Sequence, residues 1–201
     1  MADPDDDDRV FWYAPDPRAV LPLGGLRVSR SLRQRIRRAT YSVTVDRAFE
    51  RVIRACAAPA PGREQTWISD EIVEAYTALH RVGQAHSVEC WDGAGELAGG
   101  LYGVRVGGAF FGESMFSHQT DASKVALVHL VGRLRAGGFA LLDVQMQTPH
   151  LARMGAIEIP RDVYERRLAV AIRVAGDWHA QDGGRRRGAA QPRPPLSVGG
   201  A

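Results

Sequence analysis

The chain has few of the residue types that build secreted or membrane proteins. Its 201 residues include only two cysteines, Cys56 and Cys90, which lack the spacing of a disulfide framework and are expected to stay reduced in the core. No run approaches the roughly 18 consecutive apolar residues of a membrane helix. The N-terminus is acidic, whereas a secretion signal is basic and then apolar. We therefore expect a cytoplasmic protein without a membrane segment.

Several catalytic signatures are absent as well. The sequence has no Gly-x-Ser-x-Gly elbow, no phosphate-binding Walker loop and no cluster of Cys and His with metal-ligand spacing. These absences argue against a serine nucleophile, a nucleoside triphosphatase and a metal centre. We expect neither a metal nor a cofactor.

Negative charge is scarce in one segment, although the whole chain has a formal net charge of only +3. Residues 27–54 hold nine arginines against Asp46 and Glu50. Such an excess attracts polyanions and displaces counterions from a phosphate backbone, so we predict a nucleic-acid contact here. A solvated helix face is the alternative. The candidate nucleic-acid-binding residues are Arg30, Arg33, Arg35, Arg37 and Arg38.

Apolar periodicity and turn residues predict helices and strands between two polar ends. Residues 1–10 form an acidic leader and residues 175–201 a tail rich in Gly, Pro and Arg, and both are expected to be disordered. The predicted strands cover 41–45, 85–91, 97–106, 109–116 and 139–145. The predicted helices are a short one bearing Leu32 and Ile36, one capped by Asp46, and others over 69–83, 121–136, 149–154 and 163–172.

Polar groups interrupt two of the apolar strands. Glu113 lies among aromatic residues on one strand, and Asp143 and Gln145 end another. Burying such groups costs free energy unless they are hydrogen-bonded or used. Neighbouring strands of one sheet could bring all three to a single cleft, so we predict an α+β fold with a site at this place.

A series of short segments occurs in a fixed order over roughly residues 11 to 172. The segments are Trp12-Tyr13-Ala14-Pro15-Asp16-Pro17-Arg18, Ser29-Arg30-Ser31-Leu32, Thr66-Trp67-Ile68, Ala85-His86-Ser87-Val88-Glu89, Gly112-Glu113-Ser114-Met115-Phe116-Ser117, Ala122-Ser123-Lys124, Leu142-Asp143-Val144-Gln145, Pro149-His150-Leu151 and Met154-Gly155-Ala156. In this order they resemble the leucyl/phenylalanyl-tRNA–protein transferase family.

This resemblance implies a fold and an activity. Residues 26–174 would form a GNAT-like acyltransferase domain, with a mixed, mainly antiparallel sheet flanked by helices, and residues 11–25 would be the remnant of a shortened N-terminal domain. The implied enzyme moves Leu or Phe from aminoacyl-tRNA to the N-terminal Arg or Lys of acceptor proteins and so marks them for degradation. The family expectation is a monomer.

The resemblance also assigns roles at the reaction centre. Asp143 would orient and polarise Gln145, whose carbonyl oxygen would accept a hydrogen bond from the attacking α-amino group. Glu113 would lie beside the 3′ adenosine and the incoming cationic residue. Plainer alternatives are a salt bridge for Asp143, backbone satisfaction for Gln145 and an ion pair with an arginine for Glu113.

Further matched positions would bind the rest of the substrate. Leu101, Phe110 and Met115 would form an apolar socket for the Leu or Phe side chain, although each is also typical of plain core. Trp67 and Tyr76 would stack on adenine or ribose, or else pack in the core. Thr148 stands where Asn or Asp is common and keeps a hydrogen-bonding group. His86 and His150 also match, but we expect no catalytic role for them.

Two other functions fit parts of the pattern. An acyl-CoA-dependent GNAT acetyltransferase would need a Gly-rich turn for the pyrophosphate, whereas the turn here reads Ser117-His118-Gln119-Thr120-Asp121. A non-catalytic tRNA-binding protein would need no Glu113, Asp143 or Gln145, and all three are present.

Overall fold

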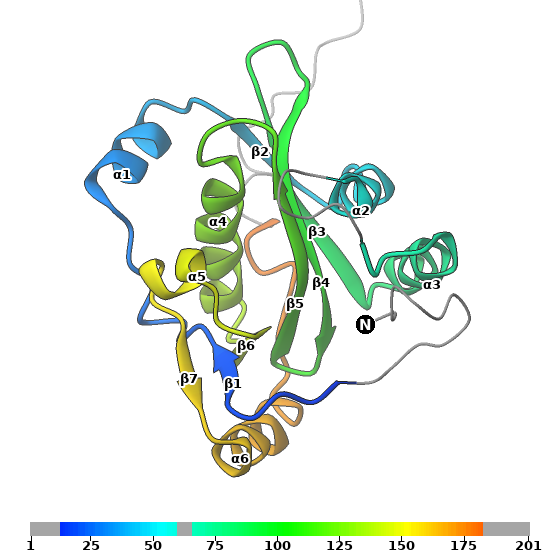
Figure 1. The fold of residues 1–201 in the computed structure, drawn as a ribbon, viewed down its shortest axis with the longest axis vertical. Coiled ribbons are helices and arrows are strands. Elements are labelled where there is room, and N and C mark those ends of the chain that lie inside the picture. Colours follow the sequence, from blue (N-terminus) through cyan, green and yellow to red (C-terminus); the bar gives the residue numbers. More distant parts are fainter. Residues whose placement is uncertain (1–12, 60–65, 183–201) are drawn as a thin grey trace, which may run out of the picture.

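A computed structural model describes residues 13–59 and 66–182 (Figure 1). The leader predicted for residues 1–10 and the last part of the predicted tail, 183–201, lie outside these ranges. The strands are β1 (Arg18–Val20), β2 (Ser42–Val45), β3 (Ala85–Trp91), β4 (Leu97–Val106), β5 (Ala109–Ser117), β6 (Leu141–Gln145) and β7 (Ile157–Ile159). The helices are α1 (Arg30–Arg37), α2 (Phe49–Ala57), α3 (Asp70–Arg81), α4 (Ala122–Ala136), α5 (Pro149–Arg153) and α6 (Arg161–Ala171).

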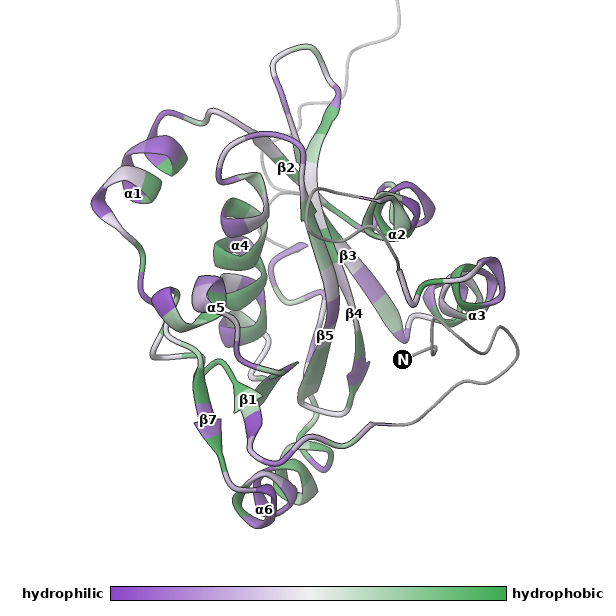
Figure 2. Ribbon diagram, viewed as in Figure 1, coloured by the Kyte–Doolittle hydropathy of each residue, from purple (hydrophilic) through white to green (hydrophobic). Residues whose placement is uncertain are grey.

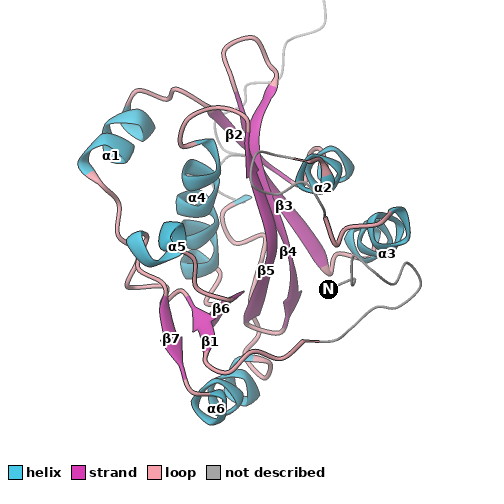
Figure 3. Cartoon of the chain, viewed as in Figure 1, coloured by secondary structure: helices cyan, strands magenta, loops and turns pink. Residues whose placement is uncertain are grey.

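The strands form one seven-stranded sheet in the order β2-β3-β4-β5-β6-β1-β7 (Figure 3). Neighbouring strands are antiparallel, with the exception of β5 and β6, which run parallel. Parallel neighbours need a long crossover, and α4 provides it. The predicted α+β class with a mixed, mainly antiparallel sheet is confirmed.

The clearest hydrophobic and capping patterns predicted helices and strands that the structure contains. The strands predicted over 85–91 and 97–106 match β3 and β4, and the helix predicted to follow Ser69 is α3. The hairpin predicted at Gly107-Gly108 joins β4 to β5. Gly107 has a φ of +57°, a backbone conformation that glycine adopts without steric cost.

β1, which lies within the segment predicted to be the remnant of a small N-terminal domain (residues 11–25), pairs into this sheet. β1 lies between β6 and β7 and pairs Ala19 with Gln145 and with Glu158. Both β1 and β7 have three residues, too few to show an alternating pattern. Their strand conformation depends on tertiary pairing, which local sequence does not reveal.

The core is divided between the two faces of the sheet. α4 packs on one face, where Leu101, Leu127 and Leu142 are buried together. α2 and α3 cover the other face, around Phe49 and Tyr102 (Figure 1). Figure 2 shows that hydrophobic residues of α3 and α4 lie toward the sheet and hydrophilic residues away from it. The sheet is therefore buried on both faces along its centre.

The segment 175–182, predicted to be disordered, instead packs against the sheet. Trp178 is 1% exposed. Its ring stacks on His86, with centroids 4.2 Å apart, and on Phe110, with centroids 5.4 Å apart. Its indole N–H donates to Asp46 at 2.8 Å. Arg133 also holds this segment, donating to the Trp178 carbonyl at 2.6 Å and to Asp182 at 2.9 Å. Composition averaged over 27 residues hides these contacts.

Asp46 does not cap α2 as predicted. α2 begins at Phe49 and has no side-chain cap. The Asp46 carboxylate accepts from the backbone N–H of Ser87 at 2.9 Å and from Trp178, and it lies 2.8 Å from His86 Nδ1. Distant partners compete with the local cap for this carboxylate.

Both cysteines, Cys56 and Cys90, are buried and are not joined in a disulfide within the described part of the chain, which agrees with the prediction of reduced core residues. Within residues 13–59 and 66–182, no helix is both long and apolar enough to cross a membrane. No group of three or more His, Cys, Asp or Glu in the same ranges is placed to hold a metal ion.

Candidate active site

A cavity opens where β5 and β6 separate. The two strands pair over only three residues each, from Ala109 with Leu141 to Phe111 with Asp143. Beyond this point a cavity of about 620 Å³ is lined by β4, β5, α4, β6 and α5. Six predicted site residues line it: Trp67, Leu101, Glu113, Met115, Gln145 and Thr148. Residues from separate segments of the sequence therefore meet around one cavity.

Gln145 and Glu113 contact each other across the gap between the strands. Gln145 Nε2 donates to Glu113 Oε2 at 3.1 Å and to the Gly112 carbonyl at 3.4 Å. These two acceptors orient the side-chain amide, and its oxygen receives no hydrogen bond from the described residues. Gln145 thus presents an acceptor oxygen beside a carboxylate, which suits an incoming amine.

Burial raises the pKa of Glu113 above its ordinary value of 4.5, and the nearby Asp143 raises it further. Hydrogen bonds from Gln145 and Tyr76 and the charge of Arg18 act in the opposite direction. A carboxylate that is costly to ionise when the cavity is empty gains from a cationic ligand, because opposite charge restores the ionised form.

Glu113→Gln should remove a pH dependence of stability. The raised pKa means that the folded protein binds this proton more tightly than the unfolded chain, so the free energy of unfolding falls as pH rises from 4.5 through the folded pKa. Denaturant unfolding between roughly pH 4 and pH 8 should show the wild type losing stability relative to Glu113→Gln. The exposed Glu158→Gln is the control and should track the wild type; parallel curves for Glu113→Gln would contradict the assignment.

Gln145 is held in a strained backbone conformation. Its φ is +63°, in the left-handed region, which costs a non-glycine residue about 1–3 kcal/mol. Asp143 Oδ1 accepts from the Gln145 backbone N–H at 2.8 Å. Asp143 therefore orients Gln145 through its backbone, and this corrects the prediction that it would polarise the side-chain amide.

Asp143 is itself fully buried and held by two side chains. Arg18 Nη2 donates to its carboxylate at 2.7 Å, and the Tyr164 hydroxyl donates at 2.6 Å. Arg18 comes from β1 and Tyr164 from α6, so three distant segments meet here. Sequence reasoning missed both partners. Arg18 belongs to a family-matched segment, which was the one available signal, and Tyr164 gave none.

The apolar part of the cavity is only partly as predicted. Leu101 and Met115 line it together with Leu127. Phe110 does not: it is 0% exposed and stacks on Trp178. Phe110 lies in the part of β5 that still pairs with β6, where the sheet is closed, so its side chain belongs to the core.

Trp67 and Thr148 line the cavity, whereas Tyr76 lies behind Glu113, which lines it. The Tyr76 hydroxyl bonds to Glu113, and its ring meets Tyr102 edge-on with centroids 5.5 Å apart. Thr148 is exposed, and its hydroxyl caps α5 by accepting from the Leu151 N–H at 3.2 Å. Tyr76 therefore contacts Glu113 and is not among the residues that line the cavity.

Four of the five predicted tRNA-binding arginines are exposed on or beside α1, namely Arg30, Arg33, Arg37 and Arg38. Arg35 differs, because it is half-buried and its Nε lies 3.3 Å from Asp121 Oδ2. This ion pair connects α1 to the residue that precedes α4. Among the exposed members, Arg33 makes a local bond, donating from Nη2 to the Val28 carbonyl at 3.4 Å.

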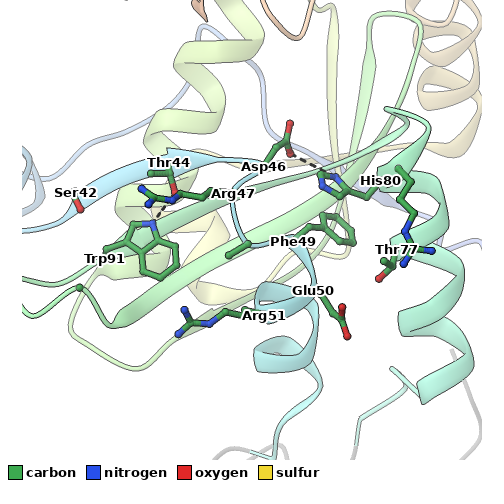
Figure 4. A pocket seen from close by; sticks show the side chains of 13 residues that line it. Ser42, Thr44, Asp46, Arg47, Phe49, Glu50, Arg51, Thr77, His80 and Trp91 are labelled. Carbon is green, nitrogen blue, oxygen red and sulfur yellow. Dashed lines mark hydrogen bonds and ion pairs between the residues drawn. The ribbon is translucent and has the colours of Figure 1, made fainter. Parts of the chain in front are cut away.

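A second large cavity, of about 790 Å³, lies between β2, α2 and α3 (Figure 4). It contains none of the predicted site residues. Figure 4 shows Asp46 and Trp91 already bonded to protein groups at its wall. The cavity between β5 and β6 is therefore the better candidate for the site.

The site joins an apolar wall to an oriented amide and a carboxylate, and it lies at the opening of a mixed α+β sheet. These features suit a protein that binds an apolar group beside a hydrogen-bonding polar group, as an acyl-group transferase needs to do.

Comparison with known proteins specifies the class further. The family model for leucyl/phenylalanyl-tRNA protein transferase matches residues 20–169. The chain therefore belongs to the leucyl/phenylalanyl-tRNA–protein transferase family, a family of aminoacyltransferases.

Curated relatives carry the same family name. The chain is 55% identical to the leucyl/phenylalanyl-tRNA–protein transferase of Rhodospirillum rubrum over 178 residues, covering 89% of this chain and 83% of the relative. It is 60% identical to that of Rubrobacter xylanophilus over 166 residues, covering 83% and 85%. It is 51% identical to that of Hyphomonas neptunium over 199 residues, covering 99% and 74%.

Solved structures are less similar. The structure of L-PGS from Bacillus licheniformis aligns with 65% of this chain and 46% of its own, at 14% identity and a TM-score of 0.46. A similarity this low supports no conclusion about the fold.

Proposed function

We propose that this protein transfers Leu or Phe from aminoacyl-tRNA to the N-terminal Arg or Lys of an acceptor protein and so marks that protein for degradation. The observation that carries the proposal is the Gln145–Glu113 hydrogen bond at the opening between β5 and β6, beside an apolar wall. Membership of the family supplies the donor and the acceptor. We propose a monomer acting in the cytoplasm, where charged tRNA is found.

The reaction needs little from the protein beyond position and polarity. The ester on the tRNA is already activated, so the acceptor amine nitrogen forms a bond to the ester carbonyl carbon and the bond from that carbon to the ribose oxygen breaks. One proton leaves the amine and one is gained by the ribose oxygen. Gln145 Oε1 accepts a hydrogen bond from the amine, and because an amide is a poor base, water or a ribose hydroxyl relays the proton.

Glu113 and the apolar wall would select the two substrates. An ionised Glu113 attracts the cationic side chain of an N-terminal Arg or Lys. Leu101, Met115 and Leu127 provide an apolar surface for a Leu or Phe side chain. A pocket of this kind discriminates between apolar side chains by about 1–3 kcal/mol and excludes charged ones more strongly.

We further propose that residues 26–174 are a GNAT-like domain. The separation of β5 and β6 beyond a short parallel pairing supports this assignment. An acyl-CoA donor is disfavoured by the turn before α4. Asp121 precedes this helix and pairs with Lys124 and Arg35 there, so a carboxylate stands where a pyrophosphate would bind.

One assay tests the proposal. The purified protein is mixed with Leu-tRNA and a peptide beginning with Arg, without ATP, and peptide leucylation is measured. The matched control is the same peptide with an acetylated N-terminus, which has no amine to attack. Absence of transfer to the free peptide would refute the proposal, tRNA retention without transfer would identify a binding protein, and turnover of acetyl-CoA would identify an acetyltransferase.

Replacing Arg33 and Arg37 together by Ala should weaken tRNA binding and reduce its salt dependence. Both side chains are exposed on one side of α1. Each lost phosphate contact should lower the slope of log affinity against log salt by about one. Filter binding at several salt concentrations measures this slope.

The control for this pair is Arg167→Ala with Arg173→Ala, two exposed arginines on and after α6. It changes the net charge equally and should leave the slope as in the wild type. The same slope for both double variants would remove α1 from the tRNA interface.

A further inference from the structure

His150 lines the cavity and has a ring nitrogen that no group of the described residues engages. It lies in the first turn of α5, five residues after Gln145, and both residues line the same cavity. His150 Nε2 is buried and has no hydrogen-bond partner in the part of the chain that the structure describes. A buried polar atom without a partner is unfavourable, so one that borders a cavity points to a ligand group that completes it.

The surroundings of His150 favour a neutral ligand group. Burial lowers the pKa of His150, and the nearby Lys124 and Arg153 lower it further, against the opposing effect of Asp121. The ring is therefore neutral near pH 7, and a second cation beside Lys124 and Arg153 would be repelled. A hydroxyl fits either tautomer of a neutral imidazole, because it can donate to the bare nitrogen or accept from the protonated one.

The proposed donor substrate has one hydroxyl next to the reacting ester. An amino acid esterified at the 3′ oxygen of the terminal ribose leaves the 2′ hydroxyl free on the adjacent carbon. Glu113 and Gln145 are assigned to the incoming amine, and the apolar wall to the amino-acid side chain. His150 lies on the segment that continues from Gln145, so it can reach the ribose side of the same ester.

We propose that His150 Nε2 forms a hydrogen bond with the free ribose hydroxyl of the aminoacyl-tRNA donor and so holds the ester in line for attack. This inference rests on the proposed function. It gives His150 a substrate-binding role, whereas from the sequence we expected only that it has no catalytic one.

A thermodynamic cycle tests the contact: the His150 imidazole and the substrate hydroxyl are removed separately and together, and the transfer rates are compared. The donors are chemically 3′-aminoacylated tRNA ending in adenosine and the same tRNA ending in 2′-deoxyadenosine, and the enzymes are the wild type and His150→Phe. We expect the wild type to prefer the ribose donor over the deoxyribose donor about tenfold more strongly than His150→Phe does, which is the size of one hydrogen bond. The chemical effect of removing the hydroxyl is common to both enzymes and cancels in this ratio.

Equal preferences of the two enzymes would overturn the proposal. His118→Phe, at an exposed position outside the cavity wall, is the control and should keep the wild-type preference. His150→Phe should melt no lower than the wild type, because it removes a buried nitrogen that lacks a partner; a lower melting temperature with equal donor preferences would indicate a structural role. A wild type that transfers to no peptide would instead refute the proposed function.

Discussion

Asp143→Ala should be the most destabilising single change at the site, with a loss of about 3–5 kcal/mol in the free energy of unfolding. Asp143 is 0% exposed and holds Arg18, whose side chain is 16% exposed, at 2.7 Å. Removing the carboxylate leaves that guanidinium and the Tyr164 hydroxyl without their acceptor. Since a domain is stable by only about 5–15 kcal/mol, much of the total would be lost.

Thermal and denaturant unfolding measure this loss. For a chain of this size the melting temperature should fall by about 10 °C. The double variant Arg18→Met with Asp143→Ala is the matched control: it removes both members of the pair, so its loss should be smaller than the sum of the two single losses. A loss below about 1 kcal/mol for Asp143→Ala would mean that the pair contributes little.

The approach of Glu113 to Gln145 could be predicted from sequence because it depends on strong local signals. Each strand is apolar and long enough to recognise, and each carries a polar group that needs a reason to be there. Two such strands in one sheet have few ways to satisfy both groups. The structure meets this expectation with the hydrogen bond between Gln145 and Glu113.

The contacts that hold Gln145 in place could not be predicted, because they are made by residues far away in the chain. Arg18 is 125 residues from Asp143 and arrives on a three-residue strand. The left-handed backbone of Gln145 gives no sequence signal, since glycine or asparagine is the usual mark of that conformation. Strained positions of this kind are found at functional sites because surrounding contacts hold them.

Phe110 and Trp178 show the limit of reading function from residue type. The family resemblance implied that Phe110 lines the pocket, yet Phe110 is buried under the closed part of the sheet, as its alternative reading as plain core would have it. Its partner Trp178 comes from a segment whose composition resembles a disordered tail. Which aromatics line the cavity depends on where β5 and β6 stop pairing, and that boundary is set by the whole sheet.

Gln145→Ala should slow transfer by about 100-fold and leave tRNA affinity unchanged within roughly twofold. The variant removes the amide oxygen that accepts from the attacking amine, and this contact matters once the amine approaches the ester. It also removes the donor to Glu113, a bond of 3.1 Å that an empty cavity can replace with water. Alanine meets the same backbone cost at φ +63° as glutamine, so the fold should tolerate it.

Single-turnover transfer with saturating charged tRNA, together with filter binding of that tRNA, separates the two effects. Gln145→Asn is the matched variant. Asparagine tolerates the left-handed backbone and keeps the amide, but it is one methylene shorter, so its oxygen stops short of the amine. If the exact position of the amide oxygen matters, Gln145→Asn should be nearly as slow as Gln145→Ala. If Gln145→Asn keeps the wild-type rate, the presence of an amide is enough. Equal losses of rate and tRNA affinity in Gln145→Ala would place Gln145 in the tRNA interface and leave the proton transfer to another group.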